Sequence, residues 1–322
     1  MALVPIADLG RYDALYVSPH ADDAALSCAG RLLGERARGQ RVLVLALFES
    51  EAGATITELL ARGADVTLAG LDSAPRRRPR APFRSIGFER SGEDADAFEA
   101  VVRVLADVAP RAKARQVYVP LAVGGHIDHR LTHEAALQVL VDEPGRNLFL
   151  YEERPEAFAP GAVRVRLGLV AARLPPGARH AARRAGLARY LFRVNAAPAA
   201  RGDLRGLIDR FRSLGAAAGE WRATRVWNPQ KAFGPRLQPV VHPAEAGVAP
   251  LAEELWAAVV PTRRRSRARA SERFRNAALA YARKIAAGAG HDHAERYWLV
   301  LPSLPGTTDS GRREELEAAL AR

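Results

Sequence analysis

The chain has little cysteine, little lysine and no long apolar run. Its one cysteine, Cys28, excludes an intrachain disulfide and a zinc or iron–sulfur site built on cysteines. No stretch approaches the roughly 18 consecutive apolar residues that a membrane span needs, and residues 1–8 lack the basic region and apolar run of a signal peptide. We therefore expect a soluble, cytoplasmic protein with no transmembrane segment, in which histidines and carboxylates hold any metal.

The net charge of +12 comes almost wholly from arginine, because three of the 48 basic residues are lysine. Residues 1–75 carry a net charge of −4, so the positive charge lies in later segments. Nine arginines and no acidic residue lie between Glu156 and Asp203. Charge confined to segments is weak evidence for nucleic-acid binding, and we expect no nucleic-acid partner. The arginine run at 76–80 is expected to be an exposed, solvated loop.

Short apolar runs alternate with helical patterns through the first half of the chain. The predicted strands are 14–18, 41–48, 64–68, 116–120 and 147–151, and the predicted helices are 22–38, 56–61, 94–108 and 129–141. This alternation with short links is typical of βαβ units. The predicted fold class is α/β: a Rossmann-like, mostly parallel sheet with helices on both faces, plus an irregular and helical C-terminal extension.

Three segments are predicted along the chain. Residues 1–155 form the Rossmann-like core, residues 156–250 an arginine-rich insertion or lid, and residues 251–322 a part that packs back on the core. Within the last two segments the patterns predict helices at 177–194, 204–218, 251–259 and 272–287, and a late strand at 296–301. The oligomeric state cannot be predicted from these patterns.

Two polar clusters each follow a predicted strand. Ser-Pro-His-Ala-Asp-Asp occupies 18–23 and Gly-Gly-His-Ile-Asp-His occupies 124–129. Because ligands of open parallel sheets bind beyond the carboxyl ends of the strands, the fold can bring the two clusters to one rim. Each cluster alone is more often a helix cap or a surface hydrogen bond. Found together, each after a strand, they predict a metal site.

Two imidazoles and one carboxylate, with a fourth position open for water, are typical of catalytic zinc. A second carboxylate nearby can take the proton of that water. Asp22 and Asp23 are adjacent, so their side chains diverge, and one is expected to bind metal while the other acts as the base. Their place at a helix N-terminus favours the ionised form of both.

The remaining histidines have weaker contexts. His133 could share a helical face with His129, but the intervening residues lack the glutamate of the zinc-protease helix, so we expect His133 to support the site or the fold. His180 and His242 have no matching context. The pair His291 and His293 is a weak alternative metal pair, expected instead to be a solvent loop.

The two clusters resemble the paired signature of the PIG-L/LmbE-like zinc-dependent N-acetylglucosaminyl deacetylases. The signature residues are Pro19-His-Ala-Asp-Asp23 and Gly125-His-Ile-Asp-His129, and the resemblance covers about residues 12–155 and fits again at 295–298. It implies one Zn²⁺ per chain, with three ligands: His20, Asp23 and His129.

The resemblance also implies roles for four other residues. Asp22 would be the general base, His126 would assist the tetrahedral intermediate or the leaving amine, and Asp128 would orient a histidine. Residues 71–75 resemble a loop that family members place near the active site, which makes Asp72 a candidate for substrate binding.

The sequence departs from the family pattern at two positions beside the metal ligands. Ala21 stands where most members have proline, and Ala24 stands where most have an acidic residue. Neither position is a ligand, so the expected deacetylation is unaffected. In the family the acidic side chain lies near the sugar pocket, so without it the resemblance does not specify which sugar is bound.

The expected function is hydrolysis of the N-acetyl group of an amino sugar or glycoconjugate, by zinc-bound water that an aspartate activates. One alternative is an amidase acting on a thiol conjugate or another non-sugar amide. Another is a non-enzymatic binder of anionic partners. The acid-free helix at 177–194 is either a peripheral helix with solvated arginines or an element in which Arg183 and Arg184 select an anionic or lipid-linked substrate.

Overall fold

The structure is a computed structural model of the chain. The residues that it describes are 3–49, 53–78, 92–123, 125–141, 143–158, 162–163, 166–167, 236–245, 247–259, 267–287 and 293–301. The predicted helices at 177–194 and 204–218 lie outside these residues. No helix of the described part combines the length and apolarity that a bilayer crossing requires.

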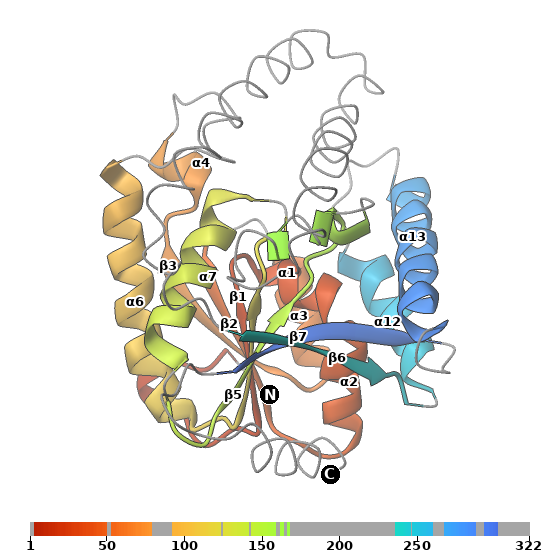
Figure 1. The fold of residues 1–322 in the computed structure, drawn as a ribbon, viewed down its shortest axis with the longest axis horizontal. Helices are drawn as coiled ribbons and strands as arrows, with labels where there is room; N and C mark the ends of the chain where they lie inside the picture. The colour runs from red at the N-terminus through yellow and green to blue at the C-terminus, as the bar shows by residue number, and fades with distance from the viewer. Residues whose placement is uncertain are drawn as a thin grey trace, which may run out of the picture.

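A seven-stranded sheet forms the centre of the molecule, in the order β3-β2-β1-β4-β5-β7-β6 (Figure 1). The strands are β1 (Ala14–Ser18), β2 (Val42–Phe48), β3 (Asp65–Leu71), β4 (Gln116–Pro120), β5 (Asn147–Tyr151), β6 (Arg236–Pro243) and β7 (Ala294–Leu301). The first five strands are parallel. β7 is antiparallel to β5, and β6 is antiparallel to β7.

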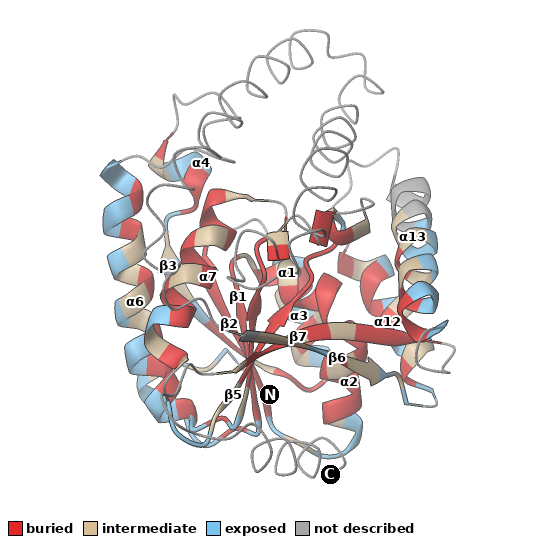
Figure 2. Cartoon of the chain, viewed as in Figure 1, coloured by how far each residue is buried: buried red, intermediate tan, exposed pale blue. Residues whose placement is uncertain are grey.

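Helices cover both faces of the sheet, and the buried residues lie between the layers (Figure 2). One face packs on α6 (Gly92–Ala112) and α7 (Ile127–Leu140). The other face packs on α1 (Ala21–Ser27), α2 (Ala29–Ala37), α3 (Gly53–Ala61) and α12 (Val248–Val259). The shorter elements and the last helix are η1 (Ile6–Asp8), α4 (Ala74–Arg77), η2 (Glu156–Phe158) and α13 (Arg267–Ala287).

The predicted fold class is confirmed. The parallel strands β1, β2, β4 and β5 are buried along nearly their whole length, as strands covered on both faces must be. In the C-terminal part, β7 belongs to the same sheet, α13 packs on β7 and β6, and α12 packs on α1, α2 and α3. β6 falls within the segment 156–250 yet pairs along its whole length with β7, and the division into three segments otherwise stays a prediction.

The prediction of a single helix over 22–38 is wrong. α1 ends at Ser27, Cys28 has φ −120° and ψ 18°, and α2 begins at Ala29. The reason lies on β7, where the Glu295 carboxylate accepts hydrogen bonds from the main-chain N–H groups of Gly30 (3.0 Å) and Arg31 (2.9 Å). These are donors of a first helical turn, which have no partner inside their own helix. Glu295 therefore stabilises a new helix start at this point.

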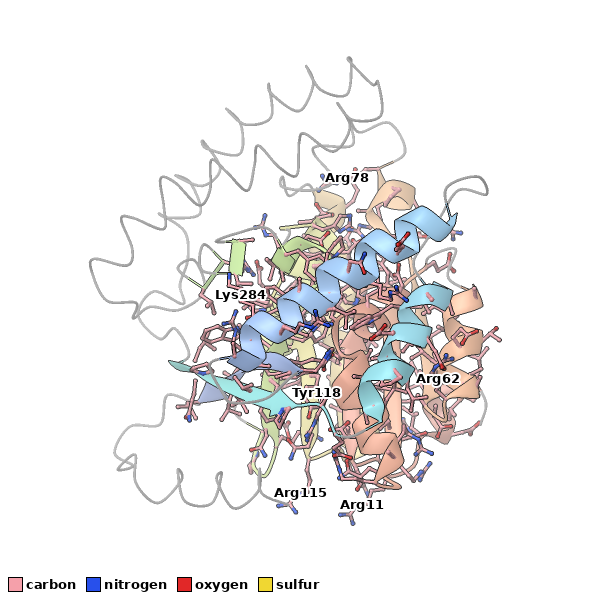
Figure 3. The ribbon with its side chains drawn as sticks, turned by 90° about the vertical axis from the view of Figure 1, so that its right-hand side faces the viewer. Arg11, Arg62, Arg78, Arg115, Tyr118 and Lys284 are labelled. Carbon is pink, nitrogen blue, oxygen red and sulfur yellow. The ribbon has the colours of Figure 1, made fainter. Side chains whose placement is uncertain are left out.

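The carboxyl ends of the parallel strands form one edge of the molecule. Figure 3 shows Arg78, which follows α4, at this edge, and Arg11 and Arg115, which precede β1 and β4, at the opposite edge. Because β1 and β4 are neighbours in the sheet, the segments that follow them meet at the first edge. Both polar clusters of the sequence lie in those segments.

Candidate active site

The two clusters come together at the starts of two helices. His20 precedes α1 and His126 precedes α7, each at the N-cap position. The His20 ring centroid lies 5.5 Å from that of His126 and 5.5 Å from that of His129, although more than a hundred residues separate them in the chain. Gly124 lies outside the described residues. The two clusters therefore meet at one rim of the sheet, as predicted.

Three side chains present donor atoms to one point. Asp23 Oδ2 lies 3.2 Å from His20 Nδ1 and 3.3 Å from His129 Nε2. One donor atom from each of the three lies within 4.8 Å of the other two. In a tetrahedral zinc site with bonds of about 2.0–2.2 Å, neighbouring donors lie roughly 3.3–3.6 Å apart. The spacing and the donor types therefore fit a zinc ion.

Each of the two histidines has a second, buried carboxylate behind it. His20 Nε2 lies 3.1 Å from Asp128 Oδ2, and His129 Nδ1 lies 3.3 Å from Glu153 Oε1. Metal-binding histidines usually donate their other ring N–H to such a carboxylate, which fixes the tautomer and the ring orientation. In this arrangement His20 would bind through Nδ1 and His129 through Nε2, the two atoms that face Asp23.

The electrostatics of the three residues favour a cation at the same point. Burial lowers the pKa of His20, but hydrogen bonds to Asp128 and Asp23 outweigh it and raise the pKa to about 10. Burial likewise lowers the pKa of His129, and Asp23 and Glu153 together raise it to about 9. Burial raises the pKa of Asp23, yet the positive charge of His129 and the contacts with His20 bring it well below its usual range. The surrounding carboxylates thus stabilise positive charge where the donor atoms meet.

A second donor set shares His20 with the first. His20, His126 and Asp128 also have donor atoms within 4.8 Å of one another. Both oxygens of Asp128 are already engaged, because Oδ1 accepts a hydrogen bond from Arg77 (2.8 Å) and Oδ2 accepts one from the Ala74 main chain (3.0 Å). An engaged carboxylate beside a guanidinium is a poorer metal ligand, so the set with Asp23 fits a metal better.

Asp22 is close in sequence to the ligands but differs from Asp23 in its electrostatics. Burial and the negative charge of Asp23 raise the pKa of Asp22 to about 6, against a smaller lowering by His20. Neighbouring carboxyl groups whose pKa values are pushed apart commonly have separate roles in acid–base chemistry. The structure thus gives Asp22 the properties of a proton acceptor and Asp23 those of a permanent anion.

Sequence reasoning missed two residues of the site. Glu153 is 1% exposed and also accepts a hydrogen bond from the Val123 main chain at 3.1 Å. Its position two residues after β5, at the same edge as the clusters, was the available signal. Arg77 was expected in an exposed loop, and that expectation is wrong: its side chain is 8% exposed and forms ion pairs with Asp94 and Asp128. Two buried carboxylates that need a cation explain the difference.

The candidate substrate-binding residues and His133 either are not among the three converging side chains or lie outside the described residues. Asp72 is exposed in the segment between β3 and α4, while Arg183 and Arg184 lie outside the described residues. The buried ring of His133 donates through Nδ1 to the Pro120 carbonyl at 2.8 Å, and burial, then the charge of Arg166, lower its pKa to about 3. A neutral, buried ring of this kind supports the fold.

The weak alternative metal pair is not assembled in the described structure. His293 is 9% exposed and stacks on Trp256, with ring centroids 6.3 Å apart. Its expected place in a solvent loop is therefore wrong, since the ring fills space beside α12. His291 lies outside the described residues.

Comparisons of the sequence with known proteins find a family and a curated relative. Residues 15–140 match the PIG-L family, described as GlcNAc-PI de-N-acetylase. The chain is 34% identical over 183 residues to the 2'-N-acetylparomamine deacetylase of Streptomyces fradiae, and the match covers 51% of this chain and 65% of that protein. The chain thus spans slightly less than two thirds of the length of this curated relative.

Solved structures of low sequence identity share the fold. A deacetylase of teicoplanin biosynthesis, solved in complex with teicoplanin, superposes with a TM-score of 0.52 at 18% identity, over 90% of this chain and 99% of that one. The zinc-inhibited form of a teicoplanin deacetylase gives a TM-score of 0.50 at 16% identity, over 91% and 99%. All six histidines and aspartates of the two clusters lie within the family match, and residues 15–140 of this chain form a domain of the PIG-L family.

Proposed function

We propose that the chain is a zinc-dependent N-deacetylase that acts on an N-acetylated amino sugar or glycoconjugate, with one zinc ion per chain. The observation that carries the proposal is the convergence of His20, Asp23 and His129 on one point. The carboxyl of Asp22 is near enough to interact electrostatically with all three. The PIG-L domain and the relative named for deacetylating an N-acetylated aminoglycoside support both the reaction and the amino-sugar class.

The reaction is the hydrolysis of an acetamide. Water adds to the acetyl carbonyl, the C–N bond then breaks, and acetate and a free amine leave. When bound by the three ligands, zinc would polarise the acetyl carbonyl and lower the pKa of a bound water. The reaction also needs one group that moves a proton and one group that stabilises the negative oxygen. The chain offers a residue for each.

Asp22 is the proton carrier in this proposal. With a pKa near 6, its carboxyl is ionised at neutral pH and is still basic enough to accept the proton of the attacking water. The protonated carboxyl can then pass that proton to the nitrogen of the leaving amine. A single carboxyl therefore serves as base in the first step and as acid in the second.

His126 is the donor to the developing oxyanion. Its Nδ1 accepts a hydrogen bond from the Asp128 main-chain N–H at 3.3 Å, so the proton of a neutral ring lies on Nε2. Burial and the positive charge of His129 lower the pKa of His126 to about 3, which keeps the ring neutral. A neutral imidazole N–H held in place can stabilise an oxyanion without a proton being transferred.

In this proposal, the part of the substrate beyond the acetamide is bound by Asp72, Arg183 and Arg184. Asp72 follows β3 at the edge that carries the metal ligands. The two arginines belong to the acid-free segment, whose positive charge suits an anionic or lipid-linked glycan.

A substrate panel tests the proposal. Zinc-loaded protein is incubated with N-acetylated sugars that are free, nucleotide-linked, lipid-linked or part of an aminoglycoside, and with an N-acetylated thiol conjugate, and released acetate is measured. We expect acetate from at least one amino sugar, with Asp22→Asn and metal-stripped protein as inactive controls. Turnover of the thiol conjugate alone would show that the substrate is not an amino sugar. Salt-dependent binding of a polyanion, without turnover of any substrate, would show that the protein is not an enzyme of this kind.

A further inference from the structure

Arg77 joins three parts of the site edge. Its Nη2 donates to Asp128 Oδ1 at 2.8 Å and to Asp94 Oδ1 at 2.9 Å, and its Nη1 donates to the Asp72 main-chain carbonyl at 2.6 Å. The guanidinium carbon lies 5.2 Å from the centroid of the Phe48 ring. With 8% of its side chain exposed, Arg77 is fixed by these contacts rather than solvated.

Asp128 is held by three groups, two of which come from α4. Arg77 engages Oδ1, whereas the Ala74 main-chain N–H (3.0 Å) and His20 Nε2 (3.1 Å) share Oδ2. The contacts from α4 fix the plane of the carboxylate, and a carboxylate fixed in that plane directs Oδ2 at His20. Because Oδ2 can only accept from the ring, Nε2 of His20 keeps its proton, and Nδ1, which lies 3.2 Å from Asp23 Oδ2, is the ring nitrogen that can bind a metal.

We infer that Arg77 is a positioning residue for the metal ligand His20, acting through Asp128; this inference rests on the proposed zinc-dependent function. Arg77 does not touch the metal position and is not a catalytic residue. Its role is to hold the Asp128 carboxylate in one orientation, so that His20 presents Nδ1 to the metal position.

The charges of the buried groups support this role over simple packing. Asp94 and Asp128 are 1% and 0% exposed, and Arg77 lies between them as a shared cation. Arg78 forms a further ion pair with Asp94, so Asp94 keeps a partner when Arg77 is replaced. Asp128 has no such second arginine in the described structure. Loss of Arg77 should therefore act mainly on Asp128 and through it on His20.

The test is the dissociation constant for zinc, measured with a competing chelator on purified full-length protein. Outer partners of metal ligands typically contribute about 10–100-fold to metal affinity, so Arg77→Met should raise the Kd for zinc by that factor. Arg77→Lys should recover part of the loss, because both carboxylate contacts come from one nitrogen that an ammonium can replace. The matched control is Arg76→Gln, since Arg76 lies on the same helix, is exposed and pairs with Glu49; its Kd should not change.

A double-mutant cycle separates this role from general destabilisation. If Arg77 acts through Asp128, Arg77→Met combined with Asp128→Asn should bind zinc no more weakly than Asp128→Asn alone. Thermal unfolding of the metal-free variants identifies those that fold, and Arg77→Met is also made with Asp94→Asn, which removes one buried charge. Two results would overturn this inference and leave the proposed function intact. One is wild-type zinc affinity in Arg77→Met, and the other is a double variant whose loss of affinity equals the product of the two single losses. Absence of zinc binding by the wild-type protein would overturn the proposed function as well.

Discussion

Two adjacent aspartates at the start of one helix have different properties because their neighbours differ. Asp23 contacts the main chain and ring of His20 and the ring of His129, so it is an anion held by two imidazoles. Asp22 is buried beside that anion, and this raises its pKa to about 6. Two residues one step apart on α1 thus differ in the way that the proposed roles of metal ligand and proton acceptor require.

We predict that Asp22→Asn abolishes most of the activity and leaves the metal in place. The amide keeps the shape of the side chain but cannot accept a proton, and loss of a general base typically costs about 10²–10⁴-fold in rate. The measurement is the rate of acetate release with zinc content determined on the same sample. Near-normal turnover with zinc bound would remove Asp22 from the mechanism.

We predict that His126→Ala lowers kcat more than it weakens zinc binding. A lost oxyanion donor typically costs about 10²–10³-fold in kcat, whereas His126 lies outside the set of ligands that best fits a metal. Both kcat and the Kd for zinc are to be measured on the variant. A parallel loss of zinc affinity and rate would instead identify His126 as a ligand.

At the scale of helices and strands, local patterns predicted much of the core correctly. The strands at 14–18, 116–120 and 147–151 have the predicted bounds, because short apolar runs between turns are typical of buried parallel strands. β6 was not predicted, since Pro239 and Pro243 interrupt its pattern and mark an edge strand. The break at Cys28 could not be predicted either, because the residue that causes it is 265 positions away in the chain.

The same limit applies to the site. The histidines and aspartates were predicted because they come in two spaced clusters directly after strands. Glu153 and Arg77 have no such spacing, and an acidic residue after a strand or an arginine in a run of arginines is usually exposed. Only the tertiary structure shows that Glu153 contacts His129 and that Arg77 contacts Asp128.

We predict that Glu295→Gln destabilises the protein by about 1–3 kcal/mol, the usual cost of disturbing a buried, charged hydrogen-bond acceptor. The carboxylate accepts from the main chains of Gly30 and Arg31 and from the Tyr297 hydroxyl at 2.8 Å. The neutral amide offers one acceptor oxygen and two unwanted donors in the same place. The free energy of unfolding by urea is the measurement, and Glu254→Gln on the exposed side of α12 is the control; equal stability of both variants would contradict the capping role.

At the scale of the whole molecule, the sheet order makes the site possible. β1 and β4 are neighbours although about a hundred residues separate them, so the parallel topology brings the two halves of the donor set together. The elements that follow the insertion, β7 and α13, contribute to the same edge, where Glu152 accepts hydrogen bonds from Arg296 (2.7 Å) and Tyr281.

The uneven distribution of charge along the chain predicts a dependence on substrate charge. Replacing Arg183 and Arg184 with glutamine should raise KM for an anionic N-acetyl glycan, more at low salt because screening is weaker there. A neutral N-acetyl sugar should be turned over as before. The measurement is KM for both substrates at two salt concentrations, and equal values for wild type and variant throughout would make this segment a scaffold.

The proposed zinc site consists of His20, Asp23 and His129 and holds one ion per chain. The most direct test is the metal content of wild-type protein and of His129→Ala, with His126→Ala as the matched histidine control, each equilibrated with zinc and then freed of unbound metal. We expect about one zinc per chain in the wild type and in His126→Ala, and none in His129→Ala, because water replaces a lost imidazole poorly. Full zinc occupancy in His129→Ala, or no zinc in the wild-type protein, would show that these three residues do not form the zinc site.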